Sequence, residues 1–171
     1  MNYKSHLAVG MASGLMLFGY SKTLPVFAFP NAGIIAPVGC IIGSVLPDIE
    51  SPTSKIGRKL KPLSTIIYML SKPFGKTGEN HRGIFHDLGL AILLCFASYF
   101  YFPELFGFWI GVLTHLVLDS MNPSGVPFFF FKKIHLLPYG VNVYSGSESG
   151  TAISFLFAAL ITGGYILLFR I

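Results

Sequence analysis

The stretch THLVLDS, residues 114–120, places a histidine and an aspartate four positions apart in apolar surroundings. His115 and Asp119 lie at the end of an apolar segment that runs from Leu105 to Leu118. Positions i and i+4 of a helix lie one turn apart on the same face, so both side chains can reach a single ion. Imidazole and carboxylate groups are zinc ligands and also suit iron or manganese. The pair therefore predicts a metal site, and the simpler alternative is a hydrogen bond within one helix.

Other histidines and acids border the remaining apolar segments of the chain. His6 precedes the first segment, GSVLPDIE ends the second, ENHRGIFHD opens the third, and SGSESG precedes the last. Ionisable groups at membrane depth are costly, so they usually pair, bind ions or face a wet cavity. We therefore predict a metal centre among the histidines and acids of this layer, which are His6, Asp48, Glu50, His81, His86, Asp87, His115, Asp119 and Glu148.

The composition indicates an integral membrane protein. Of the 171 residues, 53% are hydrophobic, 17 are phenylalanine, and only 11% are charged, against roughly 25% charged in a soluble domain. In such a protein the formal charge of +5 reflects membrane topology and contact with anionic lipid. No nucleic-acid partner is expected. Cys40 and Cys95 lie in apolar runs and are expected to be buried thiols.

Five apolar segments predict an all-α bundle of four to five short spans, in one domain over residues 1–171. They run from Leu7 to Tyr20, Gly33 to Leu46, Leu88 to Phe102, Leu105 to Leu118 and Thr151 to Phe169. Only the last approaches the roughly 20 residues that a spanning helix needs. The loop of residues 51–82 holds seven of the twelve lysines and arginines, which favours a cytoplasmic location for it. In the resulting five-span topology, all the polar positions above lie at the cytoplasmic face.

Two further segments are predicted to lie at the membrane surface. PLSTIIYMLSKPF, from Pro62 to Phe74, is too short to span and is expected to form an amphipathic helix with Lys59, Lys61 and Lys72 toward the headgroups. FFFFKK, from Phe128 to Lys133, is typical of an interfacial anchor. Gly10 and Gly14 form a G-x-x-x-G pattern, which allows close helix packing.

The motifs LPDIE, HRGIFH and THLVLDSMNPSG resemble those of the YdjM-like family of bacterial inner-membrane proteins, for which metal-dependent hydrolase activity is itself an inference. More distantly, the order of the polar residues is similar to that of the zinc-dependent phospholipase C and P1 nuclease class, which is all-helical. The resemblance implies that His6, Asp48, His86, His115, Asp119 and Glu148 are ligands and that His81 and Arg82 belong to the H-R-G element. Glu50 and Asp87 depart from the pattern, which has an aspartate and a small hydroxyl residue there.

These features together predict a hydrolase of the bacterial inner membrane that uses one or two divalent ions, most simply zinc. Its expected partners are membrane lipid and an anionic, phosphate-containing substrate, either a phosphate ester or a phosphodiester such as a phospholipid. Asp48 would bridge ions or act as general base, and Arg82 would hold a phosphoryl oxygen with its planar fork.

Two alternatives come from other classes of protein. A cation transporter would need polar residues through the depth of the membrane, where this chain has glycine, alanine, serine and leucine. A noncatalytic scaffold with a structural metal or a salt-bridge layer would have a closed site with no position for water.

Overall fold

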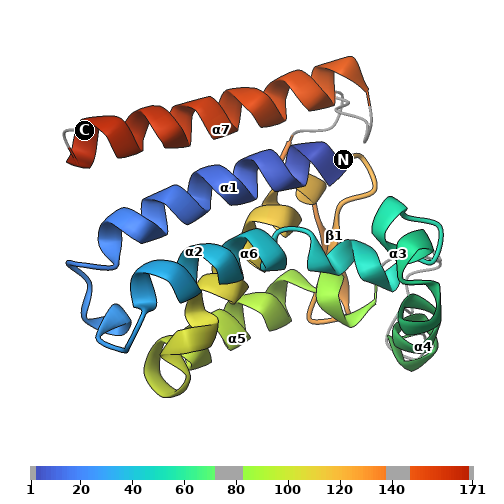
Figure 1. Cartoon of the computed structure of the whole chain (residues 1–171). Coiled ribbons are helices and arrows are strands. Elements are labelled where there is room, and N and C mark those ends of the chain that lie inside the picture. Colours follow the sequence, from blue (N-terminus) through green and yellow to red (C-terminus); the bar gives the residue numbers. More distant parts are fainter. Residues whose placement is uncertain (1–2, 72–82, 138–146, 170–171) are drawn as a thin grey trace.

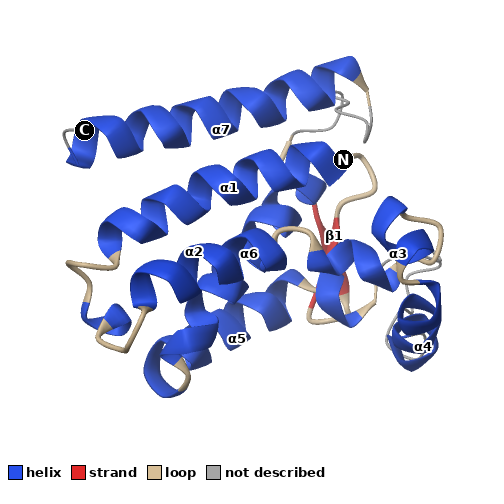
Figure 2. Cartoon of the chain, in the orientation of Figure 1, coloured by secondary structure: helices blue, strands red, loops and turns tan. Residues whose placement is uncertain are grey.

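The computed structural model describes residues 3–71, 83–137 and 147–169, and helices dominate it (Figure 2). Five long helices follow the five predicted apolar segments: α1 (Tyr3–Tyr20), α2 (Ala32–Gly43), α5 (Leu88–Tyr101), α6 (Pro103–Ser120) and α7 (Glu148–Phe169). The other elements are the 3-10 helices η1 (Pro25–Phe27), η2 (Leu46–Glu50) and η4 (Ile84–His86), the short helices α3 (Lys55–Lys59) and α4 (Lys61–Ser71), and the strands β1 (Val126–Phe128) and β2 (Lys132–Ile134).

The long helices run in alternating directions, so five helix termini meet at one end of the bundle (Figure 1). The starts of α1, α5 and α7 and the ends of α2 and α6 lie there, next to α3, α4 and the strands. We call this the polar end of the bundle. The described histidines and acids that border the apolar segments, His6, Asp48, His86, His115, Asp119 and Glu148, therefore belong to elements that begin or end at one end of the fold, as the sequence predicted.

Helix α6 lies at the centre of the bundle, where it contacts α1, α2 and α5, while α7 packs on α1. The crossing of α2 and α6 is very close because glycines face the partner backbone. A Cβ atom at Gly43 would collide with the carbonyl oxygen of Phe108, and one at Gly111 would collide with that of Cys40. Small residues at such crossings let two helix backbones approach and gain dispersion contacts over their whole length.

The G-x-x-x-G pattern of α1 serves packing within the chain. A Cβ atom at Gly10 would collide with the side chain of Ser44, and one at Gly14 would lie 3.1 Å from the carbonyl oxygen of Pro37. Gly10 and Gly14 therefore bring α1 against α2. This contact aligns the start of α1 with the end of α2, both of which carry polar residues of the candidate site.

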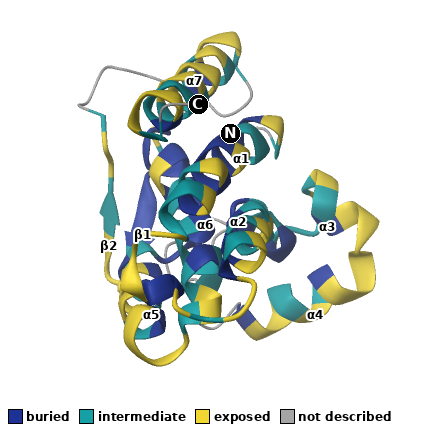
Figure 3. Ribbon diagram, turned by 60° about the vertical axis from the view of Figure 1, so that its left-hand side comes forward, coloured by how far each residue is buried: buried dark blue, intermediate teal, exposed yellow. Residues whose placement is uncertain are grey.

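The outer faces of the bundle are strongly apolar. Exposed residues follow the outer sides of α5 and α7 (Figure 3), and they include Phe96, Tyr101, Leu160 and Leu167, each at least 64% exposed; Ile34 of α2 is 66% exposed. A protein in water rarely leaves so continuous an apolar surface uncovered. Among the described residues one helix, Glu148–Phe169, is long and apolar enough to cross a membrane, and Ala32–Gly43 and Leu88–Tyr101 are shorter apolar helices.

The expectation of an all-α fold omitted a small β-hairpin. Strands β1 and β2 pair antiparallel, with Val126 opposite Ile134. The sequence FFFFKK contains the last residue of β1, the connection and the first two residues of β2. The turn contains two consecutive non-glycine residues with positive φ, Phe129 at 46° and Phe130 at 61°. Left-handed backbone is unfavourable for such residues, so other contacts must hold the turn.

The buried carboxylate of Asp87 holds this turn. Its Oδ1 accepts a hydrogen bond from the backbone N–H of Phe129 at 3.0 Å, and its Oδ2 accepts one from Phe130. Oδ1 also accepts from the N–H of Leu90 at 2.8 Å, which makes Asp87 the N-cap of α5. One side chain thus joins the hairpin to the start of α5.

Replacing Asp87 with alanine is expected to destabilise the protein by about 2 kcal/mol or more, because a helix cap is lost and buried amides lose their acceptor. Amide hydrogen exchange at Leu90, Phe129 and Phe130, whose N–H groups bind Asp87, should become faster, and thermal unfolding in detergent should occur at lower temperature. Asp87→Asn retains one acceptor oxygen and should be intermediate. Unchanged exchange in the alanine variant would show that the hairpin is held by other contacts.

Helix α4 covers most of the segment predicted as an amphipathic surface helix, and the residues beyond Ser71, including Lys72, lie outside the described part. Its small polar residues Ser64 and Ser71 are buried, and the Ser64 hydroxyl donates to the carbonyl oxygen of Ile49 at 2.7 Å. Its large apolar residues point outward, with Ile66 56% and Met69 65% exposed. A helix that presents its apolar side outward, next to the exposed Lys59 and Lys61, has the character of an interfacial helix.

Candidate metal centre

Five of the predicted site residues converge at the polar end of the bundle. His6 comes from the first turns of α1, Asp48 from η2, His86 from the end of η4, and His115 and Asp119 from the last two turns of α6. They form two overlapping groups, His6–His115–Asp119 and Asp48–His86–His115, in which one ligand atom of each residue lies within 4.8 Å of the others. Residues more than one hundred positions apart in the sequence therefore meet in one cluster.

The Asp119 carboxylate is the centre of the cluster. Its Oδ1 lies 3.4 Å from Nε2 of His6, and its Oδ2 lies 3.7 Å from Nε2 of His115 and 3.9 Å from Nε2 of His86. Two ligand atoms bound tetrahedrally at zinc–ligand distances of about 2.0–2.1 Å would be about 3.4 Å apart. The observed separations are therefore close to those of an ion's ligands, and the set of three imidazoles and a carboxylate fits a divalent cation.

The rings of His6 and His115 stack face to face, with centroids 3.7 Å apart and planes inclined by 16°. The ring of His86 meets that of His115 edge-on at 5.4 Å. All three side chains are buried. Three positive imidazolium rings at such distances would repel one another strongly in a region of low polarity. At least one ring of this group is therefore expected to be neutral and available as a ligand.

The tautomer of His115 follows from its surroundings. Its Nδ1 lies 2.9 Å from the carbonyl oxygen of Ser44, and a carbonyl oxygen can only accept, so Nδ1 carries the proton and donates. In the neutral ring Nε2 then bears a lone pair. That atom is buried and makes no hydrogen bond. The Ser44 carbonyl thus orients the Nε2 lone pair toward Asp119.

Glu50 holds His86 in the same way. Its Oε2 lies 2.9 Å from Nδ1 of His86. The carboxylate also accepts hydrogen bonds from the backbone N–H groups of Gly83 at 3.1 Å and Phe85 at 3.0 Å. Because both oxygens of the carboxylate accept from backbone amides, Glu50 acts as an acceptor toward His86 as well, so Nδ1 of His86 donates and Nε2 faces the cluster. A carboxylate behind a metal-binding histidine fixes the tautomer and the ring orientation.

Replacing Glu50 with glutamine is expected to weaken metal binding by about 10–100-fold, the usual effect of losing an outer partner of a ligating histidine. The measurement is a competition titration of the purified protein with a zinc chelator of known affinity. Glu104→Gln is the matched control, since Glu104 is exposed at the opposite end of α6. Equal affinities in the two variants would contradict a role for Glu50 behind His86.

Asp48 lies at the edge of the cluster and is partly buried. Burial raises its pKa above the ordinary value of an aspartate, and the nearby His6 opposes that shift. The carboxylate belongs to the group with His86 and His115. A nearby cation would offset the cost of burying its charge. Asp48 is thus the described acid that combines a place in the cluster with partial access to solvent.

The remaining predicted residues are not part of this cluster. Glu148 is exposed at the start of α7, and neither group of potential ligands found among the described residues includes it. His81 and Arg82 lie outside the described residues, so their predicted roles are untested. The sequence alone did not reveal that Glu50 lies behind His86. It also did not reveal the Ser44 carbonyl, because a backbone oxygen leaves no sequence signal.

The fold and the cluster define a helical protein with an apolar exterior and a polar centre at one end of its bundle. The sequence profile of the YdjM inner membrane protein family matches residues 1–170. The chain belongs to this family of inner membrane proteins. The resemblance inferred from the three motifs is thereby confirmed at the level of the family.

Relatives from two well-known bacteria are similar over most of the chain. The uncharacterized protein YvsG of Bacillus subtilis (strain 168) is 32% identical over 152 residues, which cover 86% of this chain and 85% of that protein. The inner membrane protein YdjM of Escherichia coli (strain K12) is 31% identical over 135 residues, which cover 74% of this chain and 64% of that protein. No solved structure is significantly similar.

Proposed function

We propose that this protein is a multi-pass, metal-dependent hydrolase that acts on a phosphate ester or phosphodiester at the cytoplasmic surface of the inner membrane. Its ligands are His6, His86, His115 and Asp119, with Asp48 beside them. The family is an inner membrane family, and the apolar exterior of α2, α5 and α7 supports several spans. The enzymatic activity, the metal and the substrate class are proposals.

One observation carries the proposal. Nε2 of His115 bears a lone pair in the neutral ring, yet it faces the Asp119 carboxylate oxygen at 3.7 Å in a buried position. Nε2 of His86 faces the same oxygen at 3.9 Å. Two electron-rich atoms that face each other away from water are unfavourable unless a cation or a proton lies with them. A divalent ion would bind the carboxylate oxygen and the imidazole nitrogens together.

The arrangement favours a single ion at the centre of the cluster. The Nδ1 atom of His115 is engaged by the Ser44 carbonyl, so only Nε2 is free to ligate. Both groups of potential ligands include His115, and one imidazole nitrogen binds one ion. Nitrogen and carboxylate ligands in a compact set suit zinc, and they also suit iron or manganese.

The position of the cluster supports a cytoplasmic site. It lies at the polar end of the bundle together with α3 and α4 (Figure 1), and the loop of residues 51–82 that contains these helices is rich in lysine and arginine. Basic residues collect on the cytoplasmic side of bacterial inner membranes. The same basic residues favour an anionic substrate at the surface.

The chemistry follows from the residue types. A bound divalent ion would supply Lewis-acid activation of water at neutral pH and neutralise charge on a phosphoryl group. Asp48, at the partly accessible edge of the cluster, takes the proton from the attacking water as general base. Asp119, His6, His86 and His115 fix the ligand set, and Glu50 and the Ser44 carbonyl keep the His86 and His115 rings oriented. Arg82 is the candidate phosphate clamp.

A noncatalytic polar clamp is the second candidate, and the surroundings of His86 favour it. Its Nδ1 lies 2.9 Å from Glu50, and its Nε2 lies 3.9 Å from Asp119. A protonated ring between two carboxylates satisfies both acids without metal. In that case the cluster would join α1, α6 and η2 as a structural layer.

Metal analysis of the detergent-purified protein distinguishes the two candidates. The hydrolase hypothesis predicts about one zinc, manganese or iron ion per chain and metal-dependent cleavage of a chromogenic phosphodiester or of a phospholipid. Absence of metal after incubation with zinc and manganese would contradict the metal centre and favour the clamp. Bound metal without cleavage of any phosphate ester would contradict the hydrolase and leave a structural metal site.

A further inference from the structure

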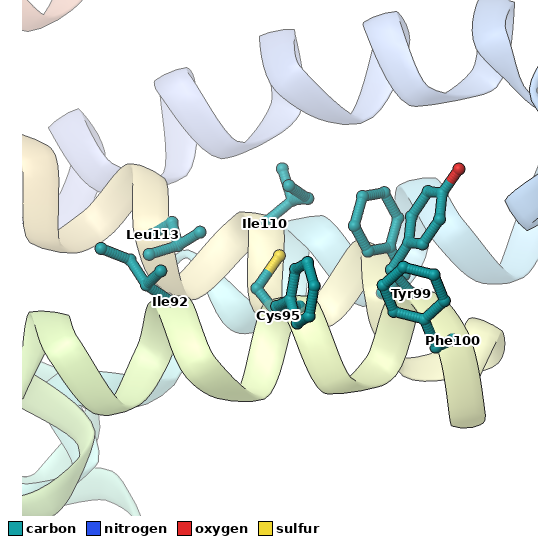
Figure 4. A pocket seen from close by; sticks show the side chains of 8 residues that line it. Ile92, Cys95, Tyr99, Phe100, Ile110 and Leu113 are labelled. Carbon is teal, nitrogen blue, oxygen red and sulfur yellow. The ribbon is translucent and has the colours of Figure 1, made fainter.

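Two apolar troughs run along helix α6 away from the polar end of the bundle. The first, of about 460 Å³, lies between α5 and α6, and its lining includes Ile92, Phe96, Phe106, Ile110 and Leu113. Figure 4 shows Ile92, Cys95, Tyr99 and Phe100 of α5 around the same space as Ile110 and Leu113 of α6. The volume of this first trough lies within the range of about 300–1,000 Å³ that small-molecule sites occupy.

The second trough, of about 290 Å³, lies between α1, α6 and α7. Ile110 and Leu113 line it too, together with Val9, Val117, Leu118 and Ile161. The two troughs therefore share one ridge on α6. Among the described side chains that line them, none is charged.

The second trough begins beside the metal centre. Thr114 and Leu118, which line it, directly precede His115 and Asp119 in α6. Val9 follows His6 by three positions in α1, which is less than one helical turn. In the first trough Ile92 lies near the start of α5, which follows His86. Both troughs thus have one end near the cluster and extend into the apolar part of the bundle.

Each trough covers most of the depth of one leaflet of a membrane. Along α6 the first trough extends from Phe106 to Leu113, about 11 Å, and the second from Ile110 to Leu118, about 12 Å, at a rise of about 1.5 Å per residue. Half of a hydrocarbon core of about 30 Å is about 15 Å. A molecule with its polar group at the cluster would therefore keep its apolar part within the cytoplasmic leaflet and would not have to leave the bilayer.

We infer that these troughs hold the two acyl chains of a glycerophospholipid whose phosphate group reaches the cluster of His6, His86, His115 and Asp119. This inference rests on the proposed function and narrows its substrate to a two-chain membrane lipid. Paired apolar troughs on either side of the Ile110–Leu113 ridge suit two chains, and the cluster at their common end suits a phosphate. A water-soluble phosphodiester would make no use of them.

Photo-crosslinking tests lipid occupancy without relying on turnover. The protein is placed in phosphatidylcholine nanodiscs that contain a small fraction of phosphatidylglycerol with a diazirine in one acyl chain, and the crosslinked residues are mapped by mass spectrometry. We expect crosslinks concentrated on Ile92, Ile110, Leu113 and Val117. Crosslinks spread evenly over exposed faces, including Leu160 and Leu167 of α7, would overturn the inference.

Variants that fill a trough show whether the crosslinks depend on it. Val117→Trp and Ile92→Trp add bulk at trough residues that are 41% and 48% exposed, so the fold should accept them. We expect each to lower the trough crosslinks about tenfold, the effect of excluding about two methylene groups from an apolar site. Leu93→Trp is the control, because Leu93 is 54% exposed on α5 and lines neither trough. An equal effect of all three variants would overturn the inference.

The proposed function can fail separately. Selective trough crosslinks in a protein without metal or hydrolysis would support the lipid site and contradict the hydrolase. Metal-dependent cleavage of a chromogenic phosphodiester without selective trough crosslinks would support the hydrolase and overturn the lipid site. A ratio of phospholipid cleavage to chromogenic ester cleavage that falls in Val117→Trp and not in Leu93→Trp would support both.

Discussion

Replacing Asp119 with asparagine is expected to remove nearly all bound metal while the protein stays folded. The carboxylate oxygens of Asp119 lie 3.4–3.9 Å from the Nε2 atoms of three histidines, so this side chain is the common neighbour of all of them. Asparagine has almost the same shape but no charge and only one acceptor oxygen. The loss of affinity should exceed the roughly 100-fold upper range for an outer partner such as Glu50.

The measurement is metal content by mass spectrometry after exhaustive dialysis, with thermal unfolding recorded in parallel. Glu104→Gln, at the other end of the same helix, should keep the metal of the wild type. His115→Ala should lose it as Asp119→Asn does. Because metal that binds only the folded state stabilises it, added zinc should raise the unfolding temperature of the wild type and not of Asp119→Asn.

Two outcomes would contradict this account. Stoichiometric metal in Asp119→Asn would place the ion elsewhere. A wild type without metal, in which Asp119→Asn lowers stability strongly, would show that Asp119 compensates protonated histidines, as in the polar clamp. In the second case the stability of the protein should fall as the pH rises and the histidines lose their protons. A metal centre behaves in the opposite way, because it loses its ion as the pH falls and the histidines gain protons.

The residues of the cluster could be predicted from the sequence because each borders an apolar segment. His6, Asp48, His86, His115 and Asp119 were expected at one membrane face, and the structure brings all five together. The prediction was correct because consecutive long helices run in opposite directions. The start of one helix and the end of the next therefore lie at the same end of the bundle (Figure 1). The order of the apolar segments along the chain, together with the position of the basic loop, therefore predicted which helix ends meet.

Other parts of the site carry no such signal. The carbonyl oxygen of Ser44 orients His115 through a contact that depends on how closely α2 and α6 cross, and any residue would offer that oxygen. The hairpin after α6 was missed because its turn uses Phe129 and Phe130 in left-handed backbone, where glycine or asparagine would have indicated a turn. The Asp87 side chain supplies the contacts that make this turn possible.

The close crossing of α2 and α6 predicts that one added methyl group at Gly111 lowers both stability and metal affinity. A Cβ atom at Gly111 would meet the carbonyl group of Cys40 and lie 2.8 Å from the backbone nitrogen of Ser44. Backbone atoms in a helix cannot move aside as a side chain can, so Gly111→Ala must push α2 away from α6. Overpacking of this kind costs about 1–3 kcal/mol, and here it also displaces the Ser44 carbonyl that orients His115.

Gly163→Ala is the matched control, because a Cβ atom there meets nothing within 4 Å. In the middle of α7 this change should leave stability unchanged or raise it by roughly 0.5–1 kcal/mol, since alanine favours helix more than glycine does. The measurement is thermal or denaturant unfolding in detergent, together with metal affinity. We expect opposite effects on stability and a loss of metal affinity in Gly111→Ala alone, because only that substitution moves the backbone behind His115. Equal stability of the two variants would show that the helices separate without cost, and the site would then not depend on their crossing.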